Sequence, residues 1–464
     1  MLLLTILSFV VVLGILITVH EFGHFAMAKL LKIRVLVFSI GFGPRLVGFT
    51  RGDTEYRVSP IPLGGYVKMA GEAFSDECKG DPGEFLSHPK WHRFLVAVSG
   101  PMMNILLAVA IFTVPYMQGV YVPRYPKEPA IVGPVSAGSI AAEAGIQPGD
   151  RIVSVNRSYV TTWEDMEITL GTAPRNALTV EILRDNQTME LRLDPPPGDE
   201  IISPISLGFR FPLSRTIVHS VDEKSPAYQA GLRAGDEILS VEKNGAVSSG
   251  YNRILTIISE SKGIPLKFEV LRPDTAVDRN ILWDTNVQQS GTIHHFDITP
   301  TEDAGRVIIG FVADFPSDKV KLGLIGAVGA SIKRNSEMTI QIFTIIGRIL
   351  TGSASVKNLA GPIEIARISG ESARDAVDTG SARGFLLLLG LISLNLGIIN
   401  LLPIPILDGG VIALLLVESV IGRDLSIRIK EKIVQAGFFF LILLMAFVIF
   451  NDLTRVFNFS RIFP

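Results

Sequence analysis

Residues 1–24 read MLLLTILSFVVVLGILITVHEFGH, an uncharged apolar run that ends in two histidines with a glutamate between them. About 20 apolar residues form a helix long enough to cross the hydrocarbon layer of a membrane. No Lys or Arg precedes the run and no small-residue cleavage site follows it, so a transmembrane helix is favoured over a signal peptide. We therefore expect the first span to end in the motif His20-Glu21-Phe22-Gly23-His24.

Three further apolar runs predict a chain that crosses the membrane four times. They lie within residues 93–122, 385–410 and 433–464, the last including an outer tail. Only 19% of all residues are charged, against about 25% in a typical soluble domain. The net charge of −2 argues against nucleic acid as a partner. The predicted fold class is a polytopic α-helical membrane protein with four transmembrane helices, in contact with the lipid bilayer.

The loop charges predict the orientation of these spans. Basic residues are frequent between the first two spans, from Lys29 to Arg93, and between the last two, over residues 411–432. Loops rich in Lys and Arg stay in the cytoplasm. Both termini and the long segment from about residue 123 to 384 are therefore expected outside, with the histidine motif towards the cytoplasmic side.

The histidine motif has the spacing of a metal site. Positions i and i+4 share one helix face, so His20 and His24 can offer their imidazoles to one ion. Glu21 is rotated away from both, which suits a base that acts on water at the metal. Zinc is expected rather than non-haem iron, because an iron site would leave Glu21 without a role. An ionisable group in a span costs about 2.5–3.5 kcal/mol and indicates function.

A third metal ligand is expected from residues 400–410, which read NLLPIPILDGG. The two prolines prevent a regular helix, and the paired glycines allow a turn or a close backbone approach. Irregular backbone at membrane depth occurs only beside protein or a water-filled cavity. Asp408 is the only carboxylate in this stretch, so we expect it to face the metal. The alternative is that Asp408 caps the helix that follows.

The segment outside the membrane contains a repeat. Residues 139–150, SIAAEAGIQPGD, match residues 225–236, SPAYQAGLRAGD. Each copy predicts a short helix that ends at a left-handed glycine, Gly145 or Gly231, followed by a turn and a half-buried strand. Further strands are predicted at residues 178–183, 189–193, 266–271 and 306–312.

This repeat resembles the tandem PDZ domains of bacterial envelope proteases. The resemblance covers residues 125–215 and 216–315 and is specific at the Ala-Gly-x-x-x-Gly-Asp turn. It implies two α+β domains, which commonly bind an extended peptide at a sheet edge. The alternative is that the pair acts as a spacer or a size filter without a bound peptide.

Two regions connect the predicted spans to each other and to the outer segment. Residues 25–92 are predicted to be cytoplasmic and membrane-associated, with β-hairpins over residues 35–69. Residues 316–384 predict amphipathic, juxtamembrane helices that either lie on the membrane surface or pack on the globular domains. In the second span, Gly100-Pro101 with Asn104 predicts a kink or a helix contact rather than catalysis. Cys78 is interpreted as an incidental loop thiol.

Taken together, the His-Glu-x-x-His motif, the span order, the tandem insertion and the Asn-x-x-Pro-x-Pro-x-Leu-Asp-Gly-Gly run resemble the site-2 protease family of intramembrane zinc metalloproteases. That resemblance implies zinc ligation by His20, His24 and Asp408, with Glu21 as the catalytic acid and base. It also implies a membrane-dipping β element, whose edge we expect to pair with an unwound substrate.

The resemblance also carries expectations about substrate and location. Asn400 matches the family position that holds or polarises substrate, and Asn395 is a second candidate of the same kind. The family's substrates are single-span membrane proteins already trimmed on the outer side, including an anti-sigma factor and remnant signal peptides, in regulated envelope-stress signalling. The implied location is the inner membrane of a Gram-negative bacterium, with the PDZ pair in the periplasm.

Two other functions are considered. A membrane-anchored PDZ adaptor with a structural metal site would have no use for Glu21, because a closed structural site needs no adjacent carboxylate. A metal transporter would need polar residues across the membrane, and the second and fourth spans supply almost none.

Overall fold

The computed structural model describes residues 2–72, 80–133, 135–136, 138–174, 177–195, 202–213, 215–274, 291–303, 306–314, 316–351 and 361–457. Cys78 lies outside these residues. The chain divides into two compact units. The first combines Met1–Gln118, Leu322–Thr344 and Leu359–Pro464, and the second combines Gly119–Lys321 and Ile345–Asn358.

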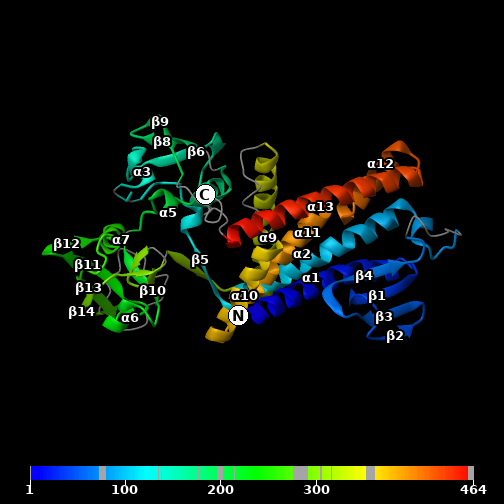
Figure 1. Ribbon diagram of the computed structural model, residues 1–464, viewed down its shortest axis with the longest axis horizontal. Coiled ribbons are helices and arrows are strands. Elements are labelled where there is room, and N and C mark those ends of the chain that lie inside the picture. Colours follow the sequence, from blue (N-terminus) through cyan, green and yellow to red (C-terminus); the bar gives the residue numbers. More distant parts are fainter. Residues whose placement is uncertain are drawn as a thin grey trace. The chain divides into compact units, whose positions relative to one another are not determined.

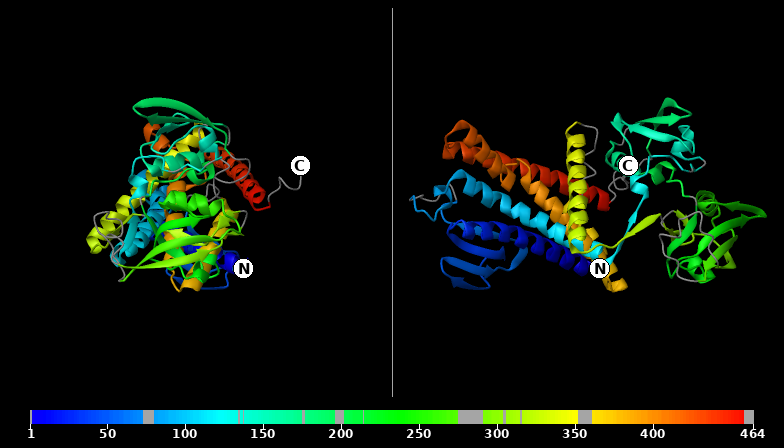
Figure 2. Two further views of the ribbon diagram at one scale, coloured as in Figure 1. Left: turned by 90° about the vertical axis from the view of Figure 1, so that its left-hand side faces the viewer. Right: turned by 180° about the vertical axis from the view of Figure 1, so that it is seen from behind.

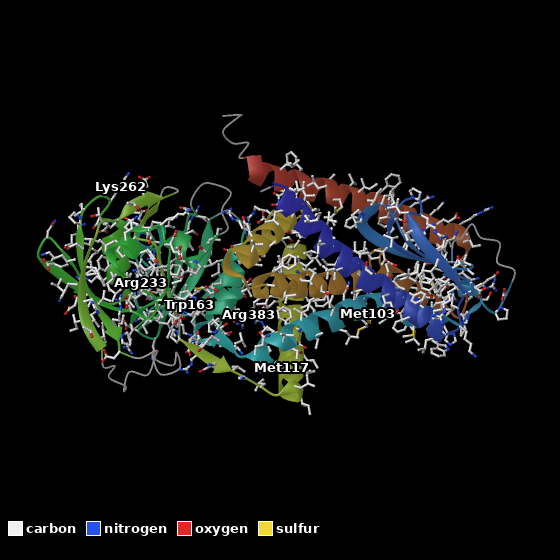
Figure 3. All side chains as sticks on the ribbon, turned by 90° about the horizontal axis from the view of Figure 1, so that it is seen from below. Met103, Met117, Trp163, Arg233, Lys262 and Arg383 are labelled. Atoms are coloured by element: carbon white, nitrogen blue, oxygen red, sulfur yellow. The ribbon has the colours of Figure 1, made fainter. Side chains whose placement is uncertain are left out.

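The first unit contains the helices that are long and apolar enough to cross a membrane. Among the described residues there are four of them (Figure 1): α1 (Leu2–Leu30), α2 (Lys90–Gln118), α11 (Arg383–Leu401) and α13 (Ile427–Phe457). This fits the predicted polytopic membrane protein. Helices α1, α2 and α11 pack side by side, as Figure 2 also shows from behind. Met103 and Met117 mark the course of α2 in Figure 3.

The helix limits differ from the predicted spans. Helix α1 continues to Leu30, so the histidine motif lies inside the helix and not at its end. Helix α11 ends at Leu401, because the prolines of the following run cannot donate the backbone hydrogen bonds of a helix. A new helix, α12 (Asp408–Ile421), then occupies much of the predicted loop over residues 411–432. It stops at Gly422, which has a left-handed conformation, and α13 begins before the predicted residue 433.

The predicted β structure over residues 35–69 is a four-stranded sheet of order β2-β3-β1-β4. Its strands are β1 (Val35–Phe42), β2 (Val47–Arg51), β3 (Thr54–Val58) and β4 (Ile61–Met69), followed by the short helix η1 (Phe85–Ser87). Simple hairpins do not describe it, because β1 and β3 pair in parallel. The sheet exposes large apolar side chains, such as Val47 (72%) and Phe49 (61%).

Two more helices precede α11 in the sequence: α9 (Leu324–Leu350) and α10 (Pro362–Thr379). Ser331 of α9 donates to the carbonyl of Val109 in α2 at 2.8 Å. Met338 packs with residues of α2 and α11. The sequence predicted either a helix on the membrane surface or a helix packed on the globular domains. Neither prediction anticipated that α9 would contact α2 and α11. Asp452 of α13 accepts backbone N–H groups at the start of α10.

The second unit contains two α+β modules, each with its own core. The first module has the sheet β7-β6-β8-β9, and Trp163 lies in its core. Its elements are α3 (Ile140–Glu143), β6 (Arg151–Val155), β7 (Ser158–Tyr159), α4 (Trp163–Thr172), β8 (Leu178–Arg184), β9 (Gln187–Leu193) and α5 (Pro204–Leu207). It is preceded by β5 (Val120–Pro123) and η2 (Tyr125–Lys127).

The second module is built around a six-stranded sheet in which β14, β13, β11, β10 and β17 are neighbours in that order and β12 pairs with β11. Its elements are β10 (Thr216–Val221), α6 (Pro226–Ala230), β11 (Glu237–Lys243), β12 (Ala246–Ser249), α7 (Tyr251–Ser259), β13 (Leu266–Pro273), β14 (Gly291–Ile298), β15 (Thr301–Asp303), β16 (Arg306–Ile308) and β17 (Phe311–Ala313). Strand β18 (Ser317–Val320) then pairs with β5. The strand predicted over residues 306–312 is thus divided between β16 and β17.

The repeated sequence produces a repeated set of contacts. In the first module, buried Asp150 pairs with Arg184, whose Nε lies 2.7 Å from a carboxylate oxygen. In the second module, buried Asp236 pairs with Arg272 at 2.7 Å. Each arginine also donates to the carbonyl of the glycine that ends the short helix. Both glycines have the predicted left-handed conformation, so the two modules share one local architecture.

Candidate active site

Three side chains from two distant segments meet in the first unit. His20 and His24 lie on one face of α1, with their Nε2 atoms 3.2 Å apart. Asp408, in the first turn of α12, places Oδ2 3.1 Å from Nε2 of His20 and Oδ1 3.3 Å from Nε2 of His24. Among the described residues, this is the one group of three or more His, Cys, Asp or Glu side chains close enough to hold a metal ion.

The spacing of these atoms fits a zinc ion. A tetrahedral zinc with bonds of about 2.0–2.2 Å holds its ligand atoms about 3.3–3.6 Å apart. The Nε2 atoms of His20 and His24 lie 3.2 Å apart, and they lie 3.1 and 3.3 Å from two different oxygens of Asp408, close to the lower end of that range. Two imidazole nitrogens and a carboxylate also form a donor set that zinc accepts, and three protein ligands leave a fourth position open, as catalytic zinc sites do.

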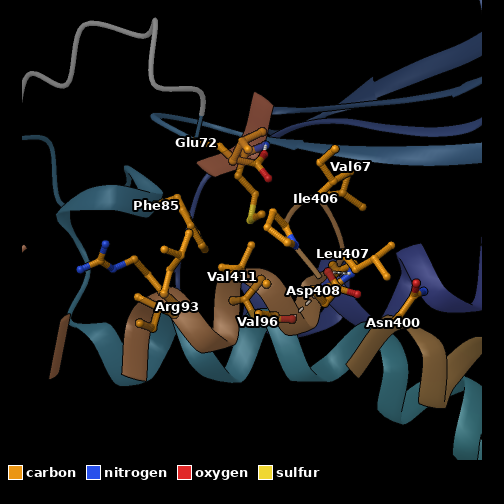
Figure 4. A pocket seen from close by; sticks show the side chains of 18 of the residues that line it. Val67, Glu72, Phe85, Arg93, Val96, Asn400, Ile406, Leu407, Asp408 and Val411 are labelled. Carbon is orange, nitrogen blue, oxygen red and sulfur yellow. Dashed lines mark hydrogen bonds and ion pairs between the residues drawn. The ribbon is translucent and has the colours of Figure 1, made fainter. Parts of the chain in front are cut away.

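Helix α2 sets the orientation of His24. Its Nδ1 lies 2.8 Å from the carbonyl oxygen of Val96, a residue that Figure 4 labels near Asp408. A carbonyl oxygen only accepts, so Nδ1 carries the proton and Nε2 presents its lone pair towards His20 and Asp408. Such a hydrogen bond on the far side of the ring is the usual support of a metal-binding histidine.

Glu21 lies beside the three side chains and contacts the sheet. Its carboxylate accepts the backbone N–H of Val67 in β4 at 3.2 Å. Glu21 is not part of the converging group of metal-binding atoms, as expected for a residue that works on water and does not bind the metal. Strand β4 thus holds this carboxylate next to the centre.

The two asparagines predicted near the site have different positions. Asn400, near the end of α11, places Nδ2 3.5 Å from Nδ1 of His20. It also lines the pocket that contains Glu21 and Asp408 (Figure 4). Asn395 does not line this pocket.

Similarity to known proteins agrees with this geometry. A family model described as peptidase family M50 matches residues 8–444. The chain belongs to peptidase family M50. This M50 peptidase is 31% identical to a Vibrio cholerae protein whose name describes a zinc metalloprotease, over 97% of this chain and 98% of that protein. The predicted family, enzyme class and zinc cofactor are thereby confirmed.

Two other relatives are named for a regulatory role. The regulator of sigma-E protease RseP of Salmonella typhimurium is 31% identical to this M50 peptidase, over 97% of this chain and 98% of the relative. The protein of the same name in Escherichia coli is 30% identical, with the same coverage of both chains. The similarity therefore extends over the inserted modules as well as the site.

A pocket of about 590 Å³ extends from the three side chains. Apolar residues form much of its lining, among them Met69, Phe85, Val96, Val411 and Val434. Arg93 lies at the end away from Asn400, as Figure 4 shows. Glu418 and Lys430, a buried ion pair with an N–O distance of 2.6 Å, also line the pocket. Nearby, a hydrogen bond from Lys90 holds the pKa of Asp424 below its usual range.

Gly100 and Asn104 of α2 were not predicted to belong to the site. A Cβ at Gly100 would collide with Nε2 of His24 and lie 2.9 Å from Cε1 of His20. A Cβ at Gly23 would collide with the carbonyl of Ser99. These glycines therefore permit α1 and α2 to approach closely, which confirms the predicted helix contact. The signal in the sequence was the Gly-Pro-x-x-Asn pattern in an otherwise apolar run.

Proposed function

We propose that this M50 peptidase is an intramembrane zinc metalloprotease that hydrolyses peptide bonds in the transmembrane segments of single-span membrane proteins. The observation that carries the proposal is the convergence of His20, His24 and Asp408 at separations that suit tetrahedral zinc. Two of the three side chains belong to a helix long and apolar enough to span a membrane. Glu21 lies beside them.

In the proposed mechanism, His20, His24 and Asp408 hold the zinc ion. A zinc ion held there would supply Lewis-acid chemistry, lowering the pKa of water and polarising the scissile carbonyl. Glu21 takes the proton of the attacking water and delivers it to the leaving amine. The hydrogen bond from Val67 N–H keeps the Glu21 carboxylate beside the centre.

Asn400 is proposed to contact substrate. It lines the pocket next to Asp408, where its amide can hold the scissile carbonyl or the developing oxyanion. Asn395 is the weaker candidate, because it lies outside the lining of the pocket.

The β element, within residues 25–92, is proposed to present an unwound substrate to the site. Strand β4 is the end strand of its sheet, and Val67 places it next to Glu21. The outer edge of an end strand offers backbone groups that can pair with an extended chain. The exposed apolar side chains of β2 support contact of the sheet with lipid.

The two modules, residues 125–215 and 216–315, are proposed to be PDZ domains on the periplasmic side of the inner membrane. Their shared helix, left-handed glycine and buried aspartate support two copies of one domain type. They are proposed to bind extended parts of substrates or to exclude bulky ones. The names of the two regulatory relatives favour a role in envelope-stress signalling, with an anti-sigma factor and remnant signal peptides as substrates.

The test compares the wild type with Glu21→Gln, both purified in detergent. Zinc content and cleavage of a model transmembrane peptide are measured for each. One zinc in both proteins, with cleavage lost only in the variant, supports the metalloprotease with Glu21 as its base. Equal cleavage in both, or no zinc in either, would overturn the proposal. Retained zinc with no cleavage by the wild type would favour the membrane-anchored adaptor.

A further inference from the structure

A further buried polar residue beside the centre is Asn104, in the middle of α2. Its side chain is completely buried. Its Nδ2 atom lies 3.4 Å from Nδ1 of His20, and its Oδ1 atom has no hydrogen-bond partner among the described residues. Burying a polar side chain is costly, so an amide buried beside a candidate metal ligand calls for an explanation.

The protonation of His20 determines which amide atom of Asn104 must face its ring. Nε2 of His20 faces His24 and Asp408, where the proposed zinc binds. A neutral imidazole that presents Nε2 as a lone pair carries its proton on Nδ1. Nδ1 therefore donates and needs an acceptor. The amide nitrogen of Asn104 cannot accept this hydrogen bond. The oxygen and nitrogen of an amide occupy nearly the same volume, and exchanging them places the oxygen, which can accept, next to Nδ1.

We propose that Asn104 is a positioning residue of the metal centre. Its side-chain oxygen accepts the Nδ1–H of His20 and fixes the imidazole with Nε2 towards the metal. Val96 performs the same task for His24 through its carbonyl oxygen. Helix α2 then supports both histidines of α1, one through backbone and one through a side chain. The inference rests on the proposed ligation of zinc by His20.

Asn104 is itself held in place by α11. The hydroxyl of Ser393, which is fully buried, donates to the backbone carbonyl of Asn104 at 2.7 Å. Gly397 lies directly over this part of α2, since a Cβ there would be 2.9 Å from the carbonyl oxygen of Pro101. The backbone at Asn104 is therefore held by α11, while its side-chain amide faces His20 of α1. Such fixed outer contacts orient metal-binding side chains and raise metal affinity.

Asn400 lies at a similar distance from the same nitrogen, 3.5 Å, but its surroundings differ. It is partly exposed and lines the pocket, where substrate can reach it. Asn104 is completely buried and does not line the pocket. Asn104 therefore supports His20, and Asn400 remains available for substrate.

The experiment measures zinc affinity of the purified full-length protein by competition with a chromogenic chelator. Asn104→Leu removes the acceptor at similar volume, and Asn104→Asp keeps an oxygen that accepts. Loss of an outer contact of this kind weakens metal binding about 10–100-fold. We expect that loss for Asn104→Leu and near wild-type affinity for Asn104→Asp. Asn335→Leu is the matched control, because Asn335 is a buried asparagine of α9, and we expect unchanged affinity.

The melting temperature is recorded for each variant, and Asn104→Ala replaces the leucine variant if that variant does not fold. The inference would be overturned if a folded Asn104→Leu or Asn104→Ala variant bound zinc with wild-type affinity. The proposed function would still be supported in that case, provided that the wild type binds zinc and cleaves the peptide. Equal weakening by leucine and aspartate would also overturn it, because packing alone would then explain the effect. If Asn400→Leu weakened zinc binding and Asn104→Leu did not, the inference would be overturned and the acceptor would be Asn400. A wild type that binds no zinc would overturn both proposals.

Discussion

Asp408 Oδ2 lies 3.1 Å from Nε2 of His20, and this contact joins the start of α12 to the middle of α1. The break between α11 and α12 makes it possible. Gly409 and Gly410 pack against the backbone of residues 401–405, where a Cβ would collide. The Pro-rich run and the two glycines thus turn the chain so that the first carboxylate of α12 faces the two histidines.

The first prediction concerns this carboxylate. Asp408→Ala should remove the zinc that the wild type retains, because two imidazoles alone hold the ion more weakly than three ligands. Metal analysis of the purified protein checks this, together with peptide cleavage. Asp424→Ala is the control, since Asp424 is half-exposed and pairs with Lys90 away from the histidines. Full zinc occupancy in Asp408→Ala would show that Asp408 is not a ligand.

The second prediction concerns the backbone N–H of Val67. Val67→Pro deletes the donor to Glu21, and proline is tolerated on an end strand where the lost N–H points away from the sheet. We expect kcat/KM to fall at least about 10-fold while zinc content stays unchanged, because the base loses its support. Val67→Leu keeps the N–H and should retain activity. Equal rates for the proline and leucine variants would contradict this role.

The third prediction concerns the buried aspartate of the first module. Asp150→Asn should loosen that module, because Arg184 loses its charged partner and Asp150 is only 1% exposed. Hydrogen exchange in β6 and β8 should accelerate at least about 10-fold. Asp194→Asn is the control, since Asp194 and Arg192 are both largely exposed and such pairs contribute little. Unchanged exchange in Asp150→Asn would show that the repeated pair is dispensable.

The sequence predicted the local features of the site because these depend on near neighbours. The i, i+4 spacing of His20 and His24 specifies a shared helix face, and a lone carboxylate beside two prolines singled out Asp408. The left-handed glycines of the repeat were predictable for the same reason. A helix commonly ends at a residue with a left-handed conformation, and glycine adopts that conformation most easily.

The features that the sequence did not predict depend on packing between distant segments. The parallel pairing of β1 with β3 joins strands whose register no local pattern specifies. The contact of α9 with α2 depends on Ser331, a residue with no distinctive neighbours in the sequence. Asn104 was assigned to a helix contact because its relation to His20 exists only once α1 and α2 pack together.

The last prediction concerns that packing. Gly100→Ala adds a methyl group that collides with Nε2 of His24 and approaches Cε1 of His20. Either the imidazoles rotate or α1 and α2 separate, and both responses disrupt the spacing that suits zinc. We expect zinc content and peptide cleavage to be lost together. Gly384→Ala is the matched control, because a Cβ at this position of α11 meets no atom within 4 Å, and it should retain both properties. Zinc bound at wild-type affinity by Gly100→Ala would show that the helices can adjust, and that close packing at Gly100 is not required for the metal site.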